Sequence, residues 1–291
     1  MNPRVSNRFE EYYEQGSEEL DLSHKSINDK DIPEICQFIN DNPQITSLNL
    51  RGNFLSDAAV KKIAGLIFLK SLNLQDNDGA PNHCISNVGA EILASHPNIT
   101  HLNLKSNRIG GRGAKALLEK NKLKVLNLAD NEIGDDGFDL SAPNTTLRSL
   151  NLFWNRIGDR GIINLVKNAV VLSCVKLGSN EFGDNGVKAL VSSETLESIN
   201  LIDSADKVLH RNDGFPKMVS EEGKKMLEVS DPLRRAKYGR EVGIATSIPT
   251  LKRLSLFVVK ESTQDHPEQL DTLKKHHEYN WVVERLSNNK I

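Results

Sequence analysis

The sequence predicts an α/β solenoid, a horseshoe in which parallel strands line the concave face and short helices cover the convex face. Its first support is a pattern, apolar-x-x-apolar-x-Leu-x-x-Asn, which ends at six asparagines: Asn53, Asn77, Asn107, Asn131, Asn155 and Asn180. Its second is a period, since spacings of 24, 30, 24, 24, 25 and 24 residues separate the fourth positions: Leu48, Leu72, Leu102, Leu126, Leu150, Val175 and Ile199. Repeats of roughly 20 to 50 residues are typical of solenoids.

Each predicted strand alternates apolar and polar residues, as in Leu126-Asn127-Leu128. Because a period of two places alternate residues on opposite faces, the leucines are expected to point inward and the intervening residues toward the concave surface. The asparagine that closes each repeat is expected to bond backbone groups of the turn. A second asparagine column, interrupted by Lys176, is expected to bond between adjacent strands: Asn49, Asn73, Asn103, Asn127, Asn151 and Asn200.

A Gly-x-x-Gly turn follows four of the predicted strands, at 110–113, 134–137, 158–161 and 183–186. Glycine permits a tight turn, so a short helix is expected after each. Apolar residues recur within Gly113-Ala114-Lys115-Ala116-Leu117, at the spacing that lays one helix face on the strands. Carboxylates at the helix starts, such as Asp159, are expected to complement the helix dipole.

The pattern divides the chain into a solenoid at 20–257 and two caps. An N-terminal capping helix is expected within 1–19 and a C-terminal capping helix within 258–291, because solenoids need their terminal coils covered. The first coil is degenerate, with Lys25 in place of the asparagine. Insertions that lengthen the repeat are expected near 78–84, 204–218 and 228–249, and such insertions map to loops.

Composition limits the classes of partner. The net charge of −2 in 291 residues gives no global attraction to nucleic acid or anionic membrane. No secretory signal core is visible at the N-terminus, and no run of 18 apolar residues occurs. Three cysteines without a close pair suggest neither a disulfide framework nor a zinc site. A cytoplasmic, monomeric protein without a cofactor is therefore expected.

The helix motifs resemble one kind of leucine-rich repeat. Gly89-Ala90-Glu91-Ile92-Leu93 and Gly113-Ala114-Lys115-Ala116-Leu117 are near matches to the 24-residue GALA variety of the ribonuclease-inhibitor-like class, and the likeness extends over about 20–201. Such repeats are similar to those of secreted bacterial effectors, so the resemblance implies a virulence protein that reaches the host cytosol by a non-Sec route and binds or sequesters a host protein. Some effectors of this kind are adaptors for a ubiquitin ligase, but the nineteen residues before Leu20 are too short for an F-box.

Phe153 and Trp154 are the predicted centre of a protein-binding site. They occupy variable positions on the concave face of a chain with only 5% aromatic residues. Large rings left in solvent are typical of interface hot spots. In the alternative interpretation, Trp154 folds onto its own loop and Phe153 is covered by a flanking side chain.

The predicted site also contains a basic rim that suits an acidic protein surface. The basic residues of the predicted site are Lys105, Arg148, Lys176 and Arg51, and its further apolar residues are Ile202 and Phe215. His101 and Cys174 project from the same face, but their separation favours neither a metal site nor a nucleophile with its base, so a non-enzymatic function is expected.

A second hypothesis concerns a basic segment that contains Arg234, Arg235, Lys237 and Arg240. Four cations within 234–240 could contact a phosphoinositide or nucleic acid. The alternative is that the segment is a solvated helix face.

Overall fold

A computed structural model describes residues 9–77, 84–120 and 122–201, together with 219, 220, 222, 223 and 226. Several predictions lie outside the described residues: the insertions near 78–84 (except Cys84), 204–218 and 228–249, the C-terminal cap at 258–291, Ile202, Phe215, Arg234, Arg235, Lys237 and Arg240.

Eight parallel strands form one sheet in sequence order, β1 to β8. They span Glu19–Asp21, Ser47–Asn49, Ser71–Asn73, His101–Asn103, Val125–Asn127, Ser149–Asn151, Cys174–Lys176 and Ser198–Asn200. The central residues pair in register from Leu20 and Leu48 through to Val175 and Ile199. The predicted α/β solenoid, with its repeat positions, is therefore confirmed.

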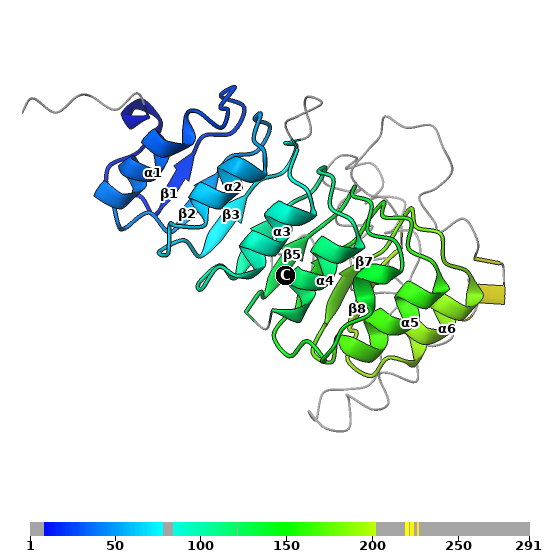
Figure 1. The fold of residues 1–291 in the computed structure, drawn as a ribbon. Helices are drawn as coiled ribbons and strands as arrows, with labels where there is room; N and C mark the ends of the chain where they lie inside the picture. The colour runs from blue at the N-terminus through cyan, green and yellow to red at the C-terminus, as the bar shows by residue number, and fades with distance from the viewer. Residues whose placement is uncertain are drawn as a thin grey trace, which may run out of the picture.

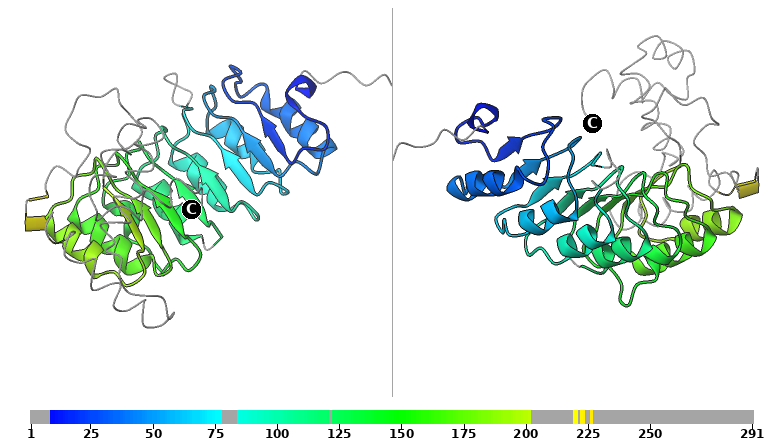
Figure 2. Two further views of the ribbon diagram at one scale, coloured as in Figure 1. Left: turned by 180° about the vertical axis from the view of Figure 1, so that it is seen from behind. Right: turned by 45° about the horizontal axis from the view of Figure 1, so that its top comes forward.

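Among the described residues, helices cover one face of this sheet and no helix covers the other (Figures 1 and 2). The α-helices α1 to α6 span Ile32–Asp41, Asp57–Ile63, Asn87–Ala94, Gly111–Glu119, Asp159–Asn168 and Asp184–Ser192. Two 3-10 helices, η1 and η2, span Glu10–Tyr12 and Asp136–Phe138. Each coil thus has one edge of strand-to-helix loops and one of helix-to-strand turns. No helix among the described residues is long and apolar enough to cross a membrane.

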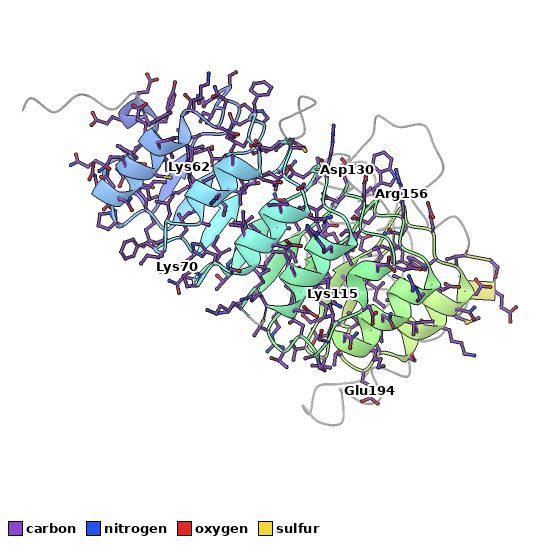
Figure 3. All side chains as sticks on the ribbon, viewed as in Figure 1. Lys62, Lys70, Lys115, Asp130, Arg156 and Glu194 are labelled. Carbon is purple, nitrogen blue, oxygen red and sulfur yellow. The ribbon has the colours of Figure 1, made fainter. Side chains whose placement is uncertain are left out.

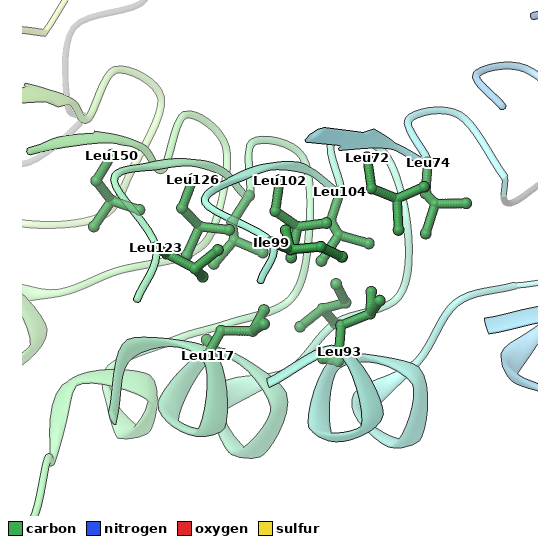
Figure 4. Close-up of a cluster of buried hydrophobic side chains, with 14 of the residues drawn as sticks. Leu72, Leu74, Leu93, Ile99, Leu102, Leu104, Leu117, Leu123, Leu126 and Leu150 are labelled. Atoms are coloured by element: carbon green, nitrogen blue, oxygen red, sulfur yellow. The ribbon is translucent and has the colours of Figure 1, made fainter. Parts of the chain in front are cut away.

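The core lies between the two layers, where strand leucines meet helix residues. In Figure 4, Leu72, Leu102 and Leu126 point from the strands toward Leu93 and Leu117 on the helices. All five side chains are at most 4% exposed. A continuous apolar layer of this kind supplies the main stabilising free energy of the fold, at roughly 25 cal/mol for each Å² of apolar surface buried.

The asparagine that closes each repeat joins neighbouring coils, as predicted. Asn53 is 2% exposed, and its Nδ2 donates to the carbonyls of Leu22 and Leu50, both at 2.9 Å. Its Oδ1 accepts the backbone N–H of Ile27 at 2.9 Å. Because these backbone groups would otherwise be buried without partners, the column is structural.

A second ladder, of helix-start residues, connects successive coils along the strand-to-helix edge. Asp57, at the start of α2, accepts the backbone N–H groups of Ser86 and Gly89 at the start of α3, both at 2.9 Å. Asp135 does the same for Gly158 and Gly161, at 2.7 and 2.9 Å. The pairs that make this contact with the next coil are Asn87 with Gly110 and Gly113, Asp159 with Gly183 and Gly186, and Asp184 with Ser220.

The contacts of this ladder give the glycines of the Gly-x-x-Gly turns a steric role that the sequence did not predict. The first glycine of the turn at 158–161, Gly158, has extended backbone with φ −93° and ψ −173°, so this turn does not require the conformational freedom of glycine, whereas the equivalent Gly134 has a φ of 59°. At Gly161, a Cβ atom would instead lie 2.5 Å from Oδ1 of Asp135, and at Gly89 it would lie 2.4 Å from Oδ1 of Asp57. At Gly161 and Gly186 the second glycine of the turn thus leaves room for a carboxylate of the preceding coil, and at Gly113 it leaves room for the amide of Asn87.

The helix expected after the fifth strand is absent, and the 3-10 helix η2 takes its place. Pro143 lacks an N–H group and disfavours helical backbone at the residue before it, so a helix in this coil could not continue through this position toward β6. Phe138 fills the space with a ring that is 1% exposed. Asn144 then closes the turn, because its Oδ1 accepts the N–H groups of Thr146 and Leu147 at 3.0 and 2.8 Å.

At the N-terminal end, the described part of the expected capping segment contains η1. Phe9 is 3% exposed and belongs to the core, and the ring of Tyr13 meets that of Phe38 edge-on with 5.5 Å between centroids. Cys36, in α1, is half-buried against the core, and burial raises the pKa of its thiol. The boundaries of the caps stay a prediction.

Candidate protein-binding surface

The concave face is built from the residues on either side of each buried strand leucine. The asparagine that follows the leucine was expected to bond its counterparts in adjacent strands. Instead, the side-chain Oδ1 of Asn151 accepts the backbone N–H of Phe153 at 3.1 Å, and the same local turn recurs at Asn49, Asn73, Asn103 and Asn127. These turns end the strands β2 to β6 and fix the direction of the two residues that follow each of them.

Trp154 lies at a backbone position that otherwise carries small or polar residues. Its φ is 55°, in the left-handed region. The equivalent residues, all with positive φ, are His24, Gly52, Asp76, Ser106, Asp130 and Ser179. A bulky residue is rare in this conformation, since the Cβ approaches the following carbonyl oxygen. Arg156 also has a φ of 55°, so two such residues flank Asn155 in this loop.

The two aromatic rings form a partly open platform. Their centroids are 6.1 Å apart, with 36° between the ring planes. Phe153 is half-buried because its ring lies over Gly178 in the next coil, where a Cβ atom would be 2.7 Å from Cε2 of Phe153. Trp154 is 47% exposed. Phe153 is thus partly covered, by backbone, whereas the indole remains open to solvent.

A polar cavity of about 280 Å³ lies beside Trp154 on the strand-to-helix edge. Its charged lining residues are Asp130, Arg156 and Glu181, and Ser179 adds a hydroxyl. Asp130 and Arg156 both project along this edge in Figure 3. The platform therefore borders a polar rim of mixed charge, and protein interfaces commonly have a polar rim around an apolar centre.

The structure groups only some of the predicted basic residues around the platform. Lys176 is on β7, one strand from Phe153, and Lys105 follows β4, two strands or about 10 Å away. Arg51 is four strands away and forms an ion pair with Asp76 at 3.1 Å. Arg148 precedes β6, about 16 Å along the chain from Phe153, and its Nη1 donates to the carbonyl of Val171 at 3.4 Å.

Two cations that the sequence analysis did not select lie on the same edge as Arg148, with Lys124 one strand away and Lys70 three strands away. Lys70 and Lys124 precede β3 and β5, and both are exposed. The backbone N–H of Arg148 donates to the carbonyl of Lys124 at 2.9 Å, so these residues occupy adjacent rungs. The sequence offered a signal for these cations, because Lys70, Lys124 and Arg148 each lie directly before a strand.

The described residues contain no group of three His, Cys, Asp or Glu side chains placed to hold a metal ion. His101 and Cys174 are the first residues of β4 and β7, three strands apart or about 14 Å. That distance is too long for a nucleophile and its base to share a proton.

A comparison with protein families agrees with this architecture. A family model described as Leucine Rich repeat matches five segments, residues 41–64, 95–118, 119–138, 144–166 and 171–191. The chain therefore carries leucine-rich repeats, and its fold is a leucine-rich-repeat solenoid. Among solved structures, it is similar to leiomodin-1 actin-binding site 2 (ABS2), with 14% sequence identity and a TM-score of 0.35, over 73% of this chain and 91% of that one. No curated protein matches it.

Proposed function

We propose that this chain is a non-enzymatic protein-interaction module that binds a partner protein at the platform formed by Phe153 and Trp154. The conformation and exposure of Trp154 carry the proposal. Its φ of 55° disfavours a bulky residue, and its 47% exposure leaves apolar surface in water. Neither the backbone nor the core accounts for a tryptophan here, and such outliers support a functional hypothesis.

The partner we propose presents an acidic surface around an apolar side chain. Lys176 and Lys105 lie one and two strands from the platform, on the same concave face. An apolar centre with a charged rim is the usual anatomy of an interface, and the rim charges set association rate and partner choice more than affinity.

Affinity capture with matched variants tests the platform. Phe153→Ala/Trp154→Ala is expected to weaken capture of the specific partner at least about 30-fold, as truncation of an aromatic hot spot does. Ile163→Ala is the control, because Ile163 is 44% exposed on α5, on the convex side. Equal capture by wild type and the double variant, or equal loss in the control, would show that binding lies elsewhere.

The effector role adds a narrower proposal that is based on the sequence resemblance. The partner is then a host protein in the eukaryotic cytosol, and the module acts as a monomer by sequestering it. Parallel capture from eukaryotic and bacterial cytosol tests this, since only the eukaryotic lysate is expected to supply a partner that depends on Trp154. A platform-dependent partner in the bacterial lysate alone would reject the effector role and retain the binding module.

A further inference from the structure

The helix-to-strand edge carries an exposed apolar pair that the concave site does not use. Ile67 and Phe68 lie in the turn between α2 and β3, and each is 50% exposed. Their neighbours Leu66 and Leu69 are buried at 2% and 0%, and these anchor the turn to the core. The turn therefore holds two large apolar side chains outward at the margin of the solenoid.

Cations outnumber carboxylates along this edge in the central coils. Five positive residues lie at the helix ends and turns between α2 and β6: Lys70, Lys120, Lys122, Lys124 and Arg148, all exposed. The carboxylates in these turns and helix ends are Glu119 and Asp139, so the net charge is five minus two, or +3. Glu119 already accepts the backbone N–H of Ser141 at 2.8 Å, and that bond holds its pKa below the ordinary value.

Hydrogen bonds join the apolar pair to the cations across three coils. Nδ2 of Asn98 donates to the carbonyl of Ile67 at 2.7 Å, and Nζ of Lys122 donates to the carbonyl of Pro97 at 2.9 Å. The backbone N–H of Lys124 donates to the carbonyl of Thr100 at 2.8 Å. The turns are thus held side by side, and Figure 3 shows Lys70 on this edge, opposite Asp130 and Arg156.

We propose that this edge, which we call the basic edge, docks on the surface of an anionic lipid bilayer. Successive turns of a solenoid end along one side, so the edge offers a row of contacts to a flat surface rather than a concavity for a folded partner. Lysines are stabilised near anionic headgroups by electrostatic attraction. Ile67 and Phe68 reach the boundary between headgroups and acyl chains, where exposed apolar side chains are stabilised.

Co-sedimentation of the full chain with vesicles tests the proposal. The chain is expected to bind vesicles of phosphatidylcholine with about 30% phosphatidylserine and not pure phosphatidylcholine, and to dissociate in about 0.5 M NaCl as screening removes the attraction. Ile67→Ser/Phe68→Ser and Lys120→Glu/Lys122→Glu are each expected to weaken binding to the anionic vesicles at least about tenfold. Ile163→Ser and Lys188→Glu, on the exposed sides of α5 and α6, are the controls and are expected to bind as wild type does.

Three outcomes would overturn the proposal: equal binding to neutral vesicles, no binding to anionic ones, or binding that the basic-edge variants retain. The alternative is that a second copy of the chain binds this edge. Sedimentation of wild type and variants without lipid tests it, because a change in oligomeric state in the variants would assign the edge to self-association. The proposal is separable from the concave site. Phe153→Ala/Trp154→Ala is expected to keep vesicle binding, and the basic-edge variants are expected to keep partner capture.

Discussion

At the scale of single residues, Trp154 combines a left-handed backbone with an exposed indole. Glycine adopts a φ of 55° without a steric penalty, whereas other residues bring Cβ toward a carbonyl oxygen. If the ring exists for binding, replacing the tryptophan with glycine should relieve this strain and leave the isolated fold intact. Stability and binding are therefore expected to respond in opposite directions.

The first prediction is that Trp154→Gly is more stable than Trp154→Ala by about 1 kcal/mol, because alanine keeps the strained Cβ and glycine removes it. Neither variant is expected to lose the stability that a core aromatic provides. Urea unfolding of both variants beside wild type measures this. If both variants lost more than about 3 kcal/mol of the free energy of unfolding, as for a buried aromatic ring, the indole would be packed as part of the fold.

His96 closes the turn between α3 and β4 through two kinds of hydrogen bond. The imidazole is 5% exposed, Nδ1 accepts the N–H groups of Asn98 and Ile99 at 3.2 Å, and Nε2 lies 3.1 Å from the carbonyl of Leu66. Nδ1 must be unprotonated to accept, and burial lowers the pKa of His96 below its ordinary value. Asn144 does the equivalent job two coils later, with a side chain that does not titrate.

The second prediction is that His96→Asn removes a pH dependence of stability. The folded-state pKa is depressed, so the free energy that neutral His96 contributes is complete above the ordinary value of about 6.5 and is lost as pH falls below it. One proton limits this loss to about 1.4 kcal/mol for each pH unit. Urea unfolding at pH 5, 6, 7 and 8 should show wild type weakening more than the variant at low pH. Parallel curves would contradict the assignment.

The residues of the platform show what the sequence could predict. Phe153 and Trp154 were identifiable because the repeat register marks which residues face outward. The strained φ of Trp154 and the contact of Phe153 with Gly178 were not, since both depend on the loop conformation and on a residue in the next coil. The ion pair of Arg51 with Asp76 and the distance of Arg148 from Phe153 could not be predicted either, because both follow from the assembled coils.

At the scale of elements, the two glycines of a Gly-x-x-Gly turn have different roles. Gly158 is the N-cap of α5, and a Cβ there would lie 3.1 Å from the nearest atom, Oδ2 of Asp135. Gly161 lies inside the helix, where a Cβ would be 2.5 Å from Oδ1 of the same aspartate. The chain itself uses serine at the equivalent N-cap Ser86, whose Oγ donates to Asp57 at 2.5 Å and accepts the N–H of Val88.

The third prediction is that Gly158→Ser and Gly161→Ser have opposite effects on stability. Serine at the cap is expected to add about 0.5 to 1 kcal/mol, through the hydroxyl's bonds and a less flexible unfolded chain. Serine at Gly161 is expected to cost about 1 to 3 kcal/mol, because the overlap must displace Asp135 or the helix. Thermal unfolding of the two variants decides between this and a purely conformational role for glycine, under which both would be destabilised alike.

The fifth coil shows where prediction of elements fails. Its turn at 134–137 has the same glycine spacing as the others, yet a 3-10 helix follows it, with Phe138 buried and Pro143 five residues further along the chain. The proline was visible in the sequence. The roles of Phe138 and Asn144 were not visible, because the space that they fill in place of a helix is defined by the neighbouring coils.

At the scale of the whole molecule, the repeat period sufficed to predict the sheet, its strand order and its register. Each coil contacts only the coil before it and the coil after it, and the contacts repeat from coil to coil. One correctly aligned repeat therefore aligns the rest. The coupling between coils is not uniform, however, and the sequence does not show this. Among the described residues, the buried Oδ1 of Asn107 has no hydrogen-bond partner, whereas Oδ1 of Asn131 accepts the N–H of Ile109 at 2.9 Å.

The step between the third and fourth coils is therefore the weaker link of the asparagine column. Nδ2 of Asn107 and of Asn131 makes equivalent bonds, to Leu74 and Leu104 in one case and to Leu104 and Leu128 in the other. The two side chains are matched in burial, at 5% and 7% exposed. They differ in one acceptor bond, which makes them a controlled pair within a single molecule.

The fourth prediction is that Asn131→Ala destabilises the chain more than Asn107→Ala by about 1 kcal/mol, the net contribution of one hydrogen bond. In a solenoid, a weak step between coils also lowers the cost of opening the structure there, since each coil contacts only its neighbours. Native-state hydrogen exchange is therefore expected to show β1 to β3 opening at lower free energy than β4 to β7. Equal losses in the two variants, with uniform exchange across the sheet, would show that coupling between coils depends on the apolar core rather than on the asparagine column.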